Sequence, residues 1–560
     1  MIEPHHNDHQ IATYWCQKCQ IPTTEMMCSI CGIDTKRLIT SGRLRPVFAD
    51  EIEIMEALIG TKLLDRPSDF VFWRSGRDYY AAGRKVFHIV GGGWNVAPYI
   101  RIYDTELFEC LSGYKHNSKL SFLSRSVDET VNLLYMANTK HVTDIEEEAI
   151  AFLQYIRACH PNLPLIVSWS GGKDSTVASV LTRKAFPNEI IPHVFADTTI
   201  EMPSTYEYLK IFRTVNPDVP IFVSKPACEF FELCREIGPP SRIQRWCCTT
   251  QKTVPLSKIF HEISNGNNIL SVGGLRRNES FRRQNYERII NNEKIDIQIL
   301  LSPLIEWTDF DVWLCTLMNT LPINQAYRSG IDRVGCAPCP NSSDWYIMIA
   351  SYIYKSYYDS WRNLLIDIFR EAEVKNPEAY VDNGAWKNRR GGGIGALGLK
   401  RTVLYRIKTE QCETDERIVN YKLCPGFSIV VMHEILKIFG EVECELCDDD
   451  WGHFSVNGPY GSFAVSAFPR CGYVYVVFDN CNTKRRLVRT LRLQLRKIQM
   501  CVGCCGCMTK CPNDAILGVG ECWYIESRRC NYCLKCVRSI KSGCIAANSL
   551  HVRETKQANQ

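Results

Sequence analysis

The chain has 560 residues, of which 45% are hydrophobic and 23% are charged, and its formal net charge is +5. A chain this long exceeds what one hydrophobic core can serve, so we expect roughly three to five domains. Neither a membrane-spanning apolar run nor a signal-peptide core is found, and the mild charge does not by itself indicate nucleic acid. The 29 cysteines therefore predict metal ligation in a reducing cytoplasm, away from membranes, rather than a secreted disulfide scaffold.

The first group of cysteines lies near the N-terminus. Two Cys-x2-Cys pairs, eight residues apart, contain Cys16, Cys19, Cys28 and Cys31. Four thiolates complete the tetrahedral coordination of Zn²⁺ and leave no position for a substrate. We predict a structural zinc ribbon over residues 10–40, with a redox or Fe–S site as the alternative. Such a ribbon can also present a nucleic-acid-binding surface, which the cysteine spacing does not determine.

The next segment, residues 41–120, is rich in turns and in short apolar runs. Residues 70–73, 86–90 and 99–103 have the composition of strands, and three glycines at 91–93 indicate a break. We predict a small β-rich domain, which has a weak resemblance to RNA-binding PUA-type modules. Residues 127–158 then have helical periodicity.

A strand, a glycine-rich loop and the start of a helix follow one another from residue 165. Residues 165–169 are apolar and residues 176–185 have helical spacing. The loop between them consists of Ser170, Gly171, Gly172, Lys173, Asp174 and Ser175. Glycines let backbone N–H groups approach a phosphate, and the helix N-terminus and the lysine add positive charge. These six residues are predicted to bind the phosphates of a nucleotide.

This loop resembles that of the N-type ATP pyrophosphatases and of their relatives, the phosphoadenosine phosphosulfate (PAPS) reductases. Asp197, at the end of the next predicted strand, and a run with Gly274, Arg276 and Arg283 resemble further motifs of the reductases. The resemblance implies an α/β fold with a doubly wound parallel sheet over residues 125–350, with the nucleotide at the carboxyl edge of the strands. It implies nucleotide contacts by the loop, Asp197, Gly274 and Arg276. The catalytic residues that it implies are Lys173, Asp174, Arg276 and Arg283.

A second group of cysteines lies inside this segment: the adjacent Cys247 and Cys248, and the distant Cys336 and Cys339. The arrangement resembles the one that holds a 4Fe–4S cluster in adenylylsulfate (APS) reductases, and similar cysteines occur in DNA phosphorothioation sulfurtransferases of the same superfamily. Zinc, or buried cysteines without a ligand, are the alternatives. The Glu-Cys-Gly-(Leu/Ile)-His tail that provides the catalytic cysteine of the reductases is not found, so the nucleophile that would take the sulfur stays open.

Three further segments follow. Residues 351–400 are predicted to form a helical linker region with a joint at 388–399, and residues 415–490 a small α+β domain. Within the latter, Cys444 and Cys447 stay unassigned. A basic, helix-like stretch at 484–497 is interpreted as a solvated face rather than a nucleic-acid groove.

Eight cysteines in two ordered runs lie within residues 495–550. The spacing resembles that of a bacterial two-cluster ferredoxin, in which the fourth cysteine of each run serves the other cluster. The resemblance implies two 4Fe–4S clusters. We assign one to Cys501, Cys504, Cys507 and Cys544, and the other to Cys511, Cys530, Cys533 and Cys536.

Two functions are consistent with these motifs. In the first, the enzyme reduces PAPS or APS to sulfite, with electrons relayed from a low-potential donor by the fused ferredoxin domain. In the second, it uses ATP with Mg²⁺ to transfer sulfur to RNA or DNA. The ferredoxin module and the central cysteine group favour the first. The intact phosphate loop, the missing tail cysteine and the zinc ribbon favour the second. The expected cofactors are three 4Fe–4S clusters, Zn²⁺ and an adenine nucleotide.

Overall fold

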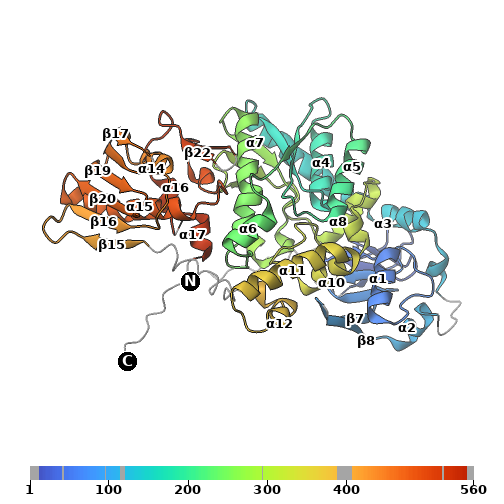
Figure 1. The fold of residues 1–560 in the computed structure, drawn as a ribbon. Coiled ribbons are helices and arrows are strands. Elements are labelled where there is room, and N and C mark those ends of the chain that lie inside the picture. Colours follow the sequence, from blue (N-terminus) through green and yellow to red (C-terminus); the bar gives the residue numbers. More distant parts are fainter. Residues whose placement is uncertain are drawn as a thin grey trace, which may run out of the picture.

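The computed structural model describes residues 12–38, 40, 43–94, 96–113, 120–292, 294–387, 407–448, 450–519, 522–540 and 542–550. Figure 1 shows a central α/β unit with the N-terminal sheets on one side of it and the C-terminal module on the other. Within the described residues, no helix is both long and apolar enough to span a membrane.

The N-terminal segment forms a small antiparallel sheet in the order β2-β1-β3, from β1 (Tyr14–Cys16), β2 (Ile21–Thr23) and β3 (Lys36–Arg37). It packs on the long helix α3 (Val127–Cys159), which begins with a capping box between Ser126 and Glu129. The Asn138 amide of α3 donates to the carbonyl oxygen of Pro22 at 3.3 Å, and its Oδ1 accepts from the backbone N–H of Thr24 at 3.0 Å. The predicted helix over 127–158 is confirmed.

A five-stranded antiparallel sheet follows, in chain order: β4 (Leu44–Pro46), β5 (Trp73–Ser75), β6 (Asp78–Ala81), β7 (Arg84–Gly93) and β8 (Val96–Ile102). Helices α1 (Ala49–Ile59) and α2 (Thr105–Leu111) belong to the same segment. The predicted break at residues 91–93 is wrong, because these glycines end β7 and pair with β8. Gly91 and Gly92 have positive φ (73° and 81°), and a Cβ on Gly92 would lie 2.4 Å from the Met348 sulfur. The glycines therefore allow the helix that contains Met348, α10 (Asp344–Ile353), to pack closely on β7.

The central sheet has the order β11-β10-β9-β12-β14-β13, and all its pairings are parallel except that of β13 with β14. Its strands are β9 (Leu165–Trp169), β10 (His193–Ala196), β11 (Ile221–Ser224), β12 (Ile269–Val272), β13 (Ile289–Asn291) and β14 (Gln298–Leu301). Its helices are α4 (Lys173–Ala185), α5 (Pro203–Val215), α6 (Phe230–Ile237), α7 (Val254–Ser264) and α8 (Asp309–Met318). The predicted parallel α/β sheet is confirmed. Strands β10 and β11 follow one another on one side of β9, whereas β12 and β14 lie on its other side. The strand order therefore reverses between β9 and β12, and open α/β sheets bind ligands at the carboxyl ends of the strands beside such a reversal.

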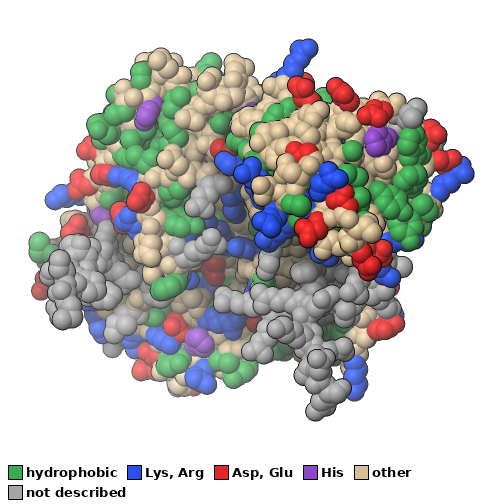
Figure 2. Space-filling model, turned by 90° about the vertical axis from the view of Figure 1, so that its left-hand side faces the viewer, with side chains coloured by type: hydrophobic (Ala, Val, Ile, Leu, Met, Phe, Trp, Pro, Cys, Tyr) green, Lys and Arg blue, Asp and Glu red, His purple; other side chains and the backbone are tan. Residues whose placement is uncertain are grey.

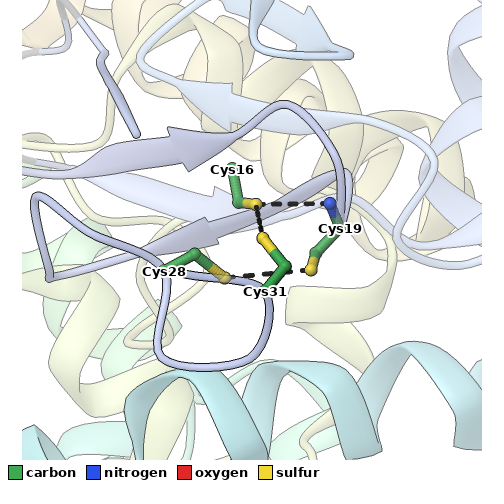
Figure 3. Close-up of side chains that lie close together, drawn as sticks. All are labelled: Cys16, Cys19, Cys28 and Cys31. Carbon is green, nitrogen blue, oxygen red and sulfur yellow. Dashed lines mark hydrogen bonds between the residues drawn. The ribbon is translucent and has the colours of Figure 1, made fainter. Parts of the chain in front are cut away.

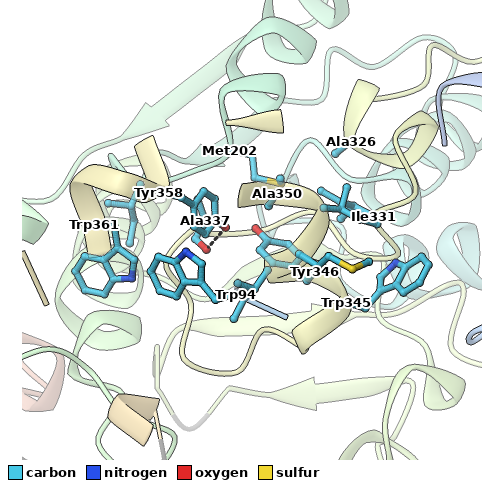
Figure 4. Close-up of a cluster of buried hydrophobic side chains, with 14 of the residues drawn as sticks. Trp94, Met202, Ala326, Ile331, Ala337, Trp345, Tyr346, Ala350, Tyr358 and Trp361 are labelled. Carbon is cyan, nitrogen blue, oxygen red and sulfur yellow. Dashed lines mark hydrogen bonds between the residues drawn. The ribbon is translucent and has the colours of Figure 1, made fainter. Parts of the chain in front are cut away.

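Helices α9 (Gln325–Arg328), α10 (Asp344–Ile353), α11 (Lys355–Glu371) and α12 (Pro377–Asp382) come next. Figure 4 shows Trp94 of the N-terminal sheet, Met202 and Ala337 of the central unit, and Tyr358 and Trp361 of α11 in one buried cluster. The segment predicted as a linker is therefore helical, but it helps to build a shared core because its apolar side chains are buried. The predicted joint at 388–399 lies outside the described residues.

The C-terminal module contains a six-stranded antiparallel sheet in the order β15-β16-β20-β19-β18-β17. The strands are β15 (Lys408–Gln411), β16 (Ile418–Lys422), β17 (Glu441–Cys447), β18 (Gly452–Gly458), β19 (Gly461–Phe468) and β20 (Tyr473–Phe478). Helices α14 (Ile429–Leu436) and α15 (Cys481–Met500) pack on it, the latter through Leu487, Leu491 and Leu495. The cysteine-rich end adds β21 (Ile516–Val519), β22 (Cys522–Ile525), α16 (Lys535–Arg538) and α17 (Ile545–Leu550).

The C-terminal module packs directly on the central unit, where α17 lies beside α6 (Figure 1). The Gln244 amide donates to the carbonyl oxygen of Asn548 at 3.1 Å. Cys504 and Cys544 belong to the same buried cluster as Phe230 and Trp246. The two parts therefore share a continuous hydrophobic core.

Candidate functional site

Two glycines let the phosphate loop approach its neighbours. Gly171 has a φ of 72°, and a Cβ there would lie 2.9 Å from Cγ2 of Thr205. A Cβ on Gly274, which follows β12, would lie 2.4 Å from the backbone carbonyl carbon of Asp174. The loop after β12 therefore touches the first turn of α4, and only glycine fits at this crossing.

A quartet of two cations and two carboxylates lies at this edge of the sheet. The Lys173 ammonium is 2.9 Å from Oδ2 of Asp174 and 3.0 Å from Oδ1 of Asp309. Arg276 donates from Nε to Asp174 at 2.5 Å and from Nη2 to Asp309 at 2.7 Å. Lys173 and Arg276 are 8% and 2% exposed, so both charges are held inside the protein. The quartet is neutral as a whole because two positive charges face two negative ones.

The electrostatics of the quartet keep all four groups charged. Burial alone would raise the pKa of Asp309, but the neighbouring Arg276 and Lys173 outweigh it and hold this pKa well below its usual range. The same two cations also lower the pKa of Asp174, again against the effect of burial. Burial would lower the pKa of Lys173, but Asp174 and Asp309 raise it. The arrangement can bind an anion through its cations, and its carboxylate oxygens are the ligand type that Mg²⁺ prefers.

The other residues of the predicted loop are brought together as well. The hydroxyl oxygens of Ser170 and Ser175 lie 3.1 Å apart, and Ser175 donates to the carbonyl oxygen of Gly172 at 2.9 Å. Asp197 lies after the neighbouring strand β10, where it accepts from the Tyr206 hydroxyl at 2.8 Å and the Thr199 backbone N–H at 2.9 Å.

Two residues of this site were not predicted from the sequence. Asp309 begins α8, and the hydroxyl of Tyr327 accepts the backbone N–H of Lys173 at 3.1 Å. A sequence signal for Asp309 exists, because Thr308 and Asp311 form a capping box that marks a helix start after a strand. No local pattern marks Tyr327, which reaches the loop from a distant helix.

Arg283 lies apart from the quartet. Its guanidinium forms an ion pair with Glu279, and among the described residues we find no ion pair between it and Asp174 or Asp309. Its predicted catalytic role thus gains no support from the geometry of the phosphate loop.

The central cysteines lie close to the nucleotide residues. Cys248 begins a π-helical turn (Cys248–Thr253) that leads into α7, a distortion that is frequent at functional sites. Cys336 forms an isolated β-bridge with Glu201, and its thiol lies 3.5 Å from Oε1 of that residue. The short segment 197–201 therefore joins Asp197 of the nucleotide site to Cys336 of the cysteine set.

The thiols of this central set influence one another. A hydrogen bond from Cys247 lowers the pKa of Cys248 to about 6, with help from nearby Arg245, Lys294 and Lys252 and against the effect of burial. Burial raises the pKa of Cys336, and Cys248 is among the groups that raise the pKa of Cys339. A soft metal centre that binds thiolates would relieve this crowding of buried thiols.

The N-terminal cysteines form a tight quartet (Figure 3). The sulfur atoms of Cys16 and Cys31 are 3.5 Å apart, those of Cys19 and Cys28 are 3.8 Å apart, and all four lie within 4.8 Å of one another. Zinc–sulfur bonds of about 2.3 Å in a tetrahedron place sulfur atoms about 3.8 Å apart. The quartet fits a single Zn²⁺ ion.

The C-terminal cysteines form an inner set and an outer set, named here by their distance from the central unit. The inner set, Cys501, Cys504, Cys507 and Cys544, lines one cavity together with Lys497. The outer set comprises Cys511, Cys530, Cys533 and Cys536. The pKa of Cys530 is raised by burial and, to a smaller extent, by its neighbours Cys511 and Cys533. The two sets follow the assignment expected from the alternating ligand pattern, and the binding of one 4Fe–4S cluster by each set stays a prediction.

Lys497 lies between the two C-terminal sets and is only 2% exposed. Burial would lower its pKa, but Cys507 and Cys544 of the inner set and Cys536 of the outer set raise it. A buried cation at this position would stabilise negative charge on the thiolates of both sets.

Comparison with known proteins gives a consistent picture. The family model of the phosphoadenosine phosphosulfate reductase domain matches residues 164–342. An adenosine 5′-phosphosulfate reductase of Lysinibacillus sphaericus is 30% identical over 181 residues, which are 31% of this chain and 72% of that protein. An uncharacterized protein of Methanocaldococcus jannaschii is 32% identical over 266 residues, which are 47% of this chain and 53% of that protein. This chain thus spans about half the length of that relative.

Among solved structures, the phosphoadenylyl-sulfate reductase of Candida auris in a phosphate complex is 19% identical. The match covers 35% of this chain and 94% of the reductase chain, with a TM-score of 0.27.

Proposed function

This chain belongs to the phosphoadenosine phosphosulfate reductase family, and we propose that it reduces an adenylylated sulfate, PAPS or APS, to sulfite with electrons supplied through its C-terminal module. One observation carries the proposal. The segment 197–201 connects Asp197, beside the phosphate loop, to Cys336 of the central cysteine set through the bridge between Glu201 and Cys336. The phosphosulfate group of a nucleotide bound at the loop would therefore lie beside a group of thiolates suited to redox chemistry.

The proposed reaction is a two-electron reduction. The bond between the sulfur and the bridging phosphate oxygen breaks with its electron pair on that oxygen, so the nucleotide leaves with the oxygen. Two electrons supplied through the C-terminal module reduce the sulfur, which leaves as sulfite. In this step Lys173, Arg276 and the N-terminus of α4 would bind the negative charge of the substrate. Asp174 and Asp309 would hold both cations in place through the contacts described above.

The cofactors are part of the proposal. Cys247, Cys248, Cys336 and Cys339 would hold one 4Fe–4S cluster, the inner and outer sets would hold one each, and the N-terminal quartet would hold Zn²⁺. When bound, the clusters supply one-electron transfer at low potential. The continuous core between Cys504 and Trp246 places the inner set against the central unit.

A second candidate function is ATP-dependent transfer of sulfur to RNA or DNA. The neutral quartet favours it, because two carboxylates beside two cations suit a nucleotide that arrives with Mg²⁺ better than a free polyanion.

A parallel turnover assay separates the two functions. The protein is purified without oxygen, its iron, zinc and sulfide are measured, and it is incubated with PAPS, APS or ATP and a low-potential reductant. Sulfite release from PAPS or APS is the expected result. Pyrophosphate release from ATP that depends on RNA or DNA, without sulfite from either sulfate, would overturn the reductase proposal in favour of sulfur transfer.

A further inference from the structure

Exposed arginines line one side of α15, and α16 continues the positive charge. Figure 2, drawn from the side of the C-terminal module, shows Lys and Arg side chains gathered near the middle of that face. We name as the basic face a set of exposed cations on these two helices: Arg485, Arg486, Arg489, Arg492, Lys535 and Arg538. Within the described part of the chain, no carboxylate forms an ion pair with any of them. Their charges are therefore available to an outside partner.

Hydrogen bonds join the two helices into one surface. The guanidinium of Arg538 donates to the Thr490 hydroxyl at 3.2 Å and to the carbonyl oxygen of Arg486 at 3.4 Å. Arg538 of α16 is thereby fixed beside the arginines of α15. Two carboxylates lie near these elements: Glu416 accepts from the Cys481 thiol at 3.9 Å at the start of α15, and Glu441 is among the groups that raise the pKa of Tyr532, beside Cys533. Among the described residues, neither forms an ion pair with the basic face.

The α16 end of the basic face adjoins the outer cysteine set. Lys535 and Arg538 flank Cys536 on α16, and the exposed Arg528 and Arg529 directly precede Cys530. Cys530 and Cys533 are half-buried, whereas Cys504 of the inner set is buried against the central unit. The outer set is thus the one that an external redox partner can approach.

We propose that the basic face is the docking site of an acidic electron-carrier protein, one whose carboxylates surround its own redox group. The inference rests on the proposed function, because it gives the outer cysteine set a role as the entry point for electrons. Electron transfer needs close approach, and unpaired cations around the entry point steer an acidic partner to it. Electrostatic steering raises association rates by roughly tenfold to a thousandfold, and transient redox complexes use small, polar interfaces.

The test measures reduction of the protein itself rather than turnover. The double variant Arg485→Glu/Arg489→Glu is compared with Lys210→Glu/Arg213→Glu on α5, which makes the same charge change on exposed residues of the central unit. A reduced, acidic two-iron ferredoxin is mixed with each protein, and bleaching of the iron–sulfur absorbance is followed at increasing salt. Dithionite replaces the ferredoxin in a second series.

We expect the ferredoxin to reduce the Arg485/Arg489 variant at least about tenfold more slowly than the wild type at low salt, and the difference to shrink as salt screens the charges. The α5 variant should behave like the wild type, and dithionite should reduce all three proteins equally fast. Equal rates with ferredoxin in both variants would overturn the proposal. A defect of the Arg485/Arg489 variant that is seen only as weaker binding of a transfer RNA would also overturn the proposal, and it would assign the face to nucleic acid. A lack of sulfite from PAPS and APS would contradict the proposed function but leave this reduction assay unchanged.

Discussion

The thiol of Cys228 donates to the carbonyl oxygen of Gly503 at 3.6 Å. Cys228 follows β11 of the central unit, and Gly503 lies between two cysteines of the inner set. The carbonyl oxygen of Cys228 also accepts from the amide of Gln251, in the turn that begins at Cys248, at 3.3 Å. One residue therefore links the loop of the inner cysteine set to the turn that presents the central set.

The phosphate loop gives the first prediction. Lys173→Ala should weaken nucleotide binding by roughly 1.5–3 kcal/mol, because a charge-assisted contact to the nucleotide is lost, and turnover should fall by more. Iron and zinc contents should not change. Lys184→Ala, at the far end of the same helix, serves as the control. Isothermal titration with adenine nucleotide checks the effect, and equal affinities in both variants would mean that the loop does not bind phosphate.

Gly274→Ala tests the close approach of the two loops. The added methyl group would meet the backbone of Asp174 at 2.4 Å, so the first turn of α4 must move. We expect a loss of about 1–3 kcal/mol in the free energy of unfolding and a larger loss of nucleotide affinity. Gly93→Ala is the matched control, because its nearest neighbour would be at 3.7 Å. Denaturant titration should separate the two variants, and equal stabilities would contradict the packing argument.

Metal content tests the four cysteine groups together. Twelve thiolates in three sets and four in the ribbon imply about twelve iron ions and about one zinc ion per chain. Cys336→Ser should lower iron by about four with zinc unchanged, and Cys16→Ser should remove zinc alone. The exposed Cys159→Ser is the control. A wild-type value near eight iron ions would remove the central cluster from the proposal.

The role of the C-terminal module is tested in the whole chain, because Cys504 and Cys544 pack in the same core as Phe230 and a truncation would expose that core. Cys533→Ser, in the outer set, should abolish activity with a protein electron donor while nucleotide affinity and the iron of the central set are retained. Activity and titration measurements on one preparation check this. Full activity with the protein donor would exclude a role of the outer set in electron supply.

The junction of the two parts should depend on pH. His261 of α7 lies 2.7 Å from Asp514, whose hydrogen bond raises the pKa of the histidine, with a smaller contribution from Asp296 and against the effect of burial. Because the folded-state pKa is the higher one, this stabilisation is complete below about pH 6.5 and is lost as the pH rises through the folded-state pKa. The protection factors of the α17 amides, which correct for the faster intrinsic exchange at higher pH, should therefore fall above that range in the wild type but much less in Asp514→Asn. Identical pH dependence in both would show that the pair does not hold the junction.

The sequence by itself determined the features that depend on local spacing. The phosphate loop from Ser170 to Ser175 could be predicted because a strand, two glycines and a helix start are consecutive in the chain. The parallel sheet was implied by the resemblance of this loop and of the motifs after it to those of the PAPS reductases. The grouping of Cys16 with Cys31 could be predicted for the same reason, since short metal-binding loops keep their ligands close in sequence.

The tertiary structure decided which distant groups meet. Asp309 joins Lys173 because β9 and the strand before α8 end at the same edge of the sheet. Cys336 lies beside Glu201, and Cys228 beside Gly503, through contacts between segments more than a hundred residues apart. Such contacts arise from the packing of whole elements, which depends on the summed burial of many side chains rather than on any local pattern. The loop was therefore visible in the sequence, whereas the quartet around it and its connection to the cysteine sets required the fold.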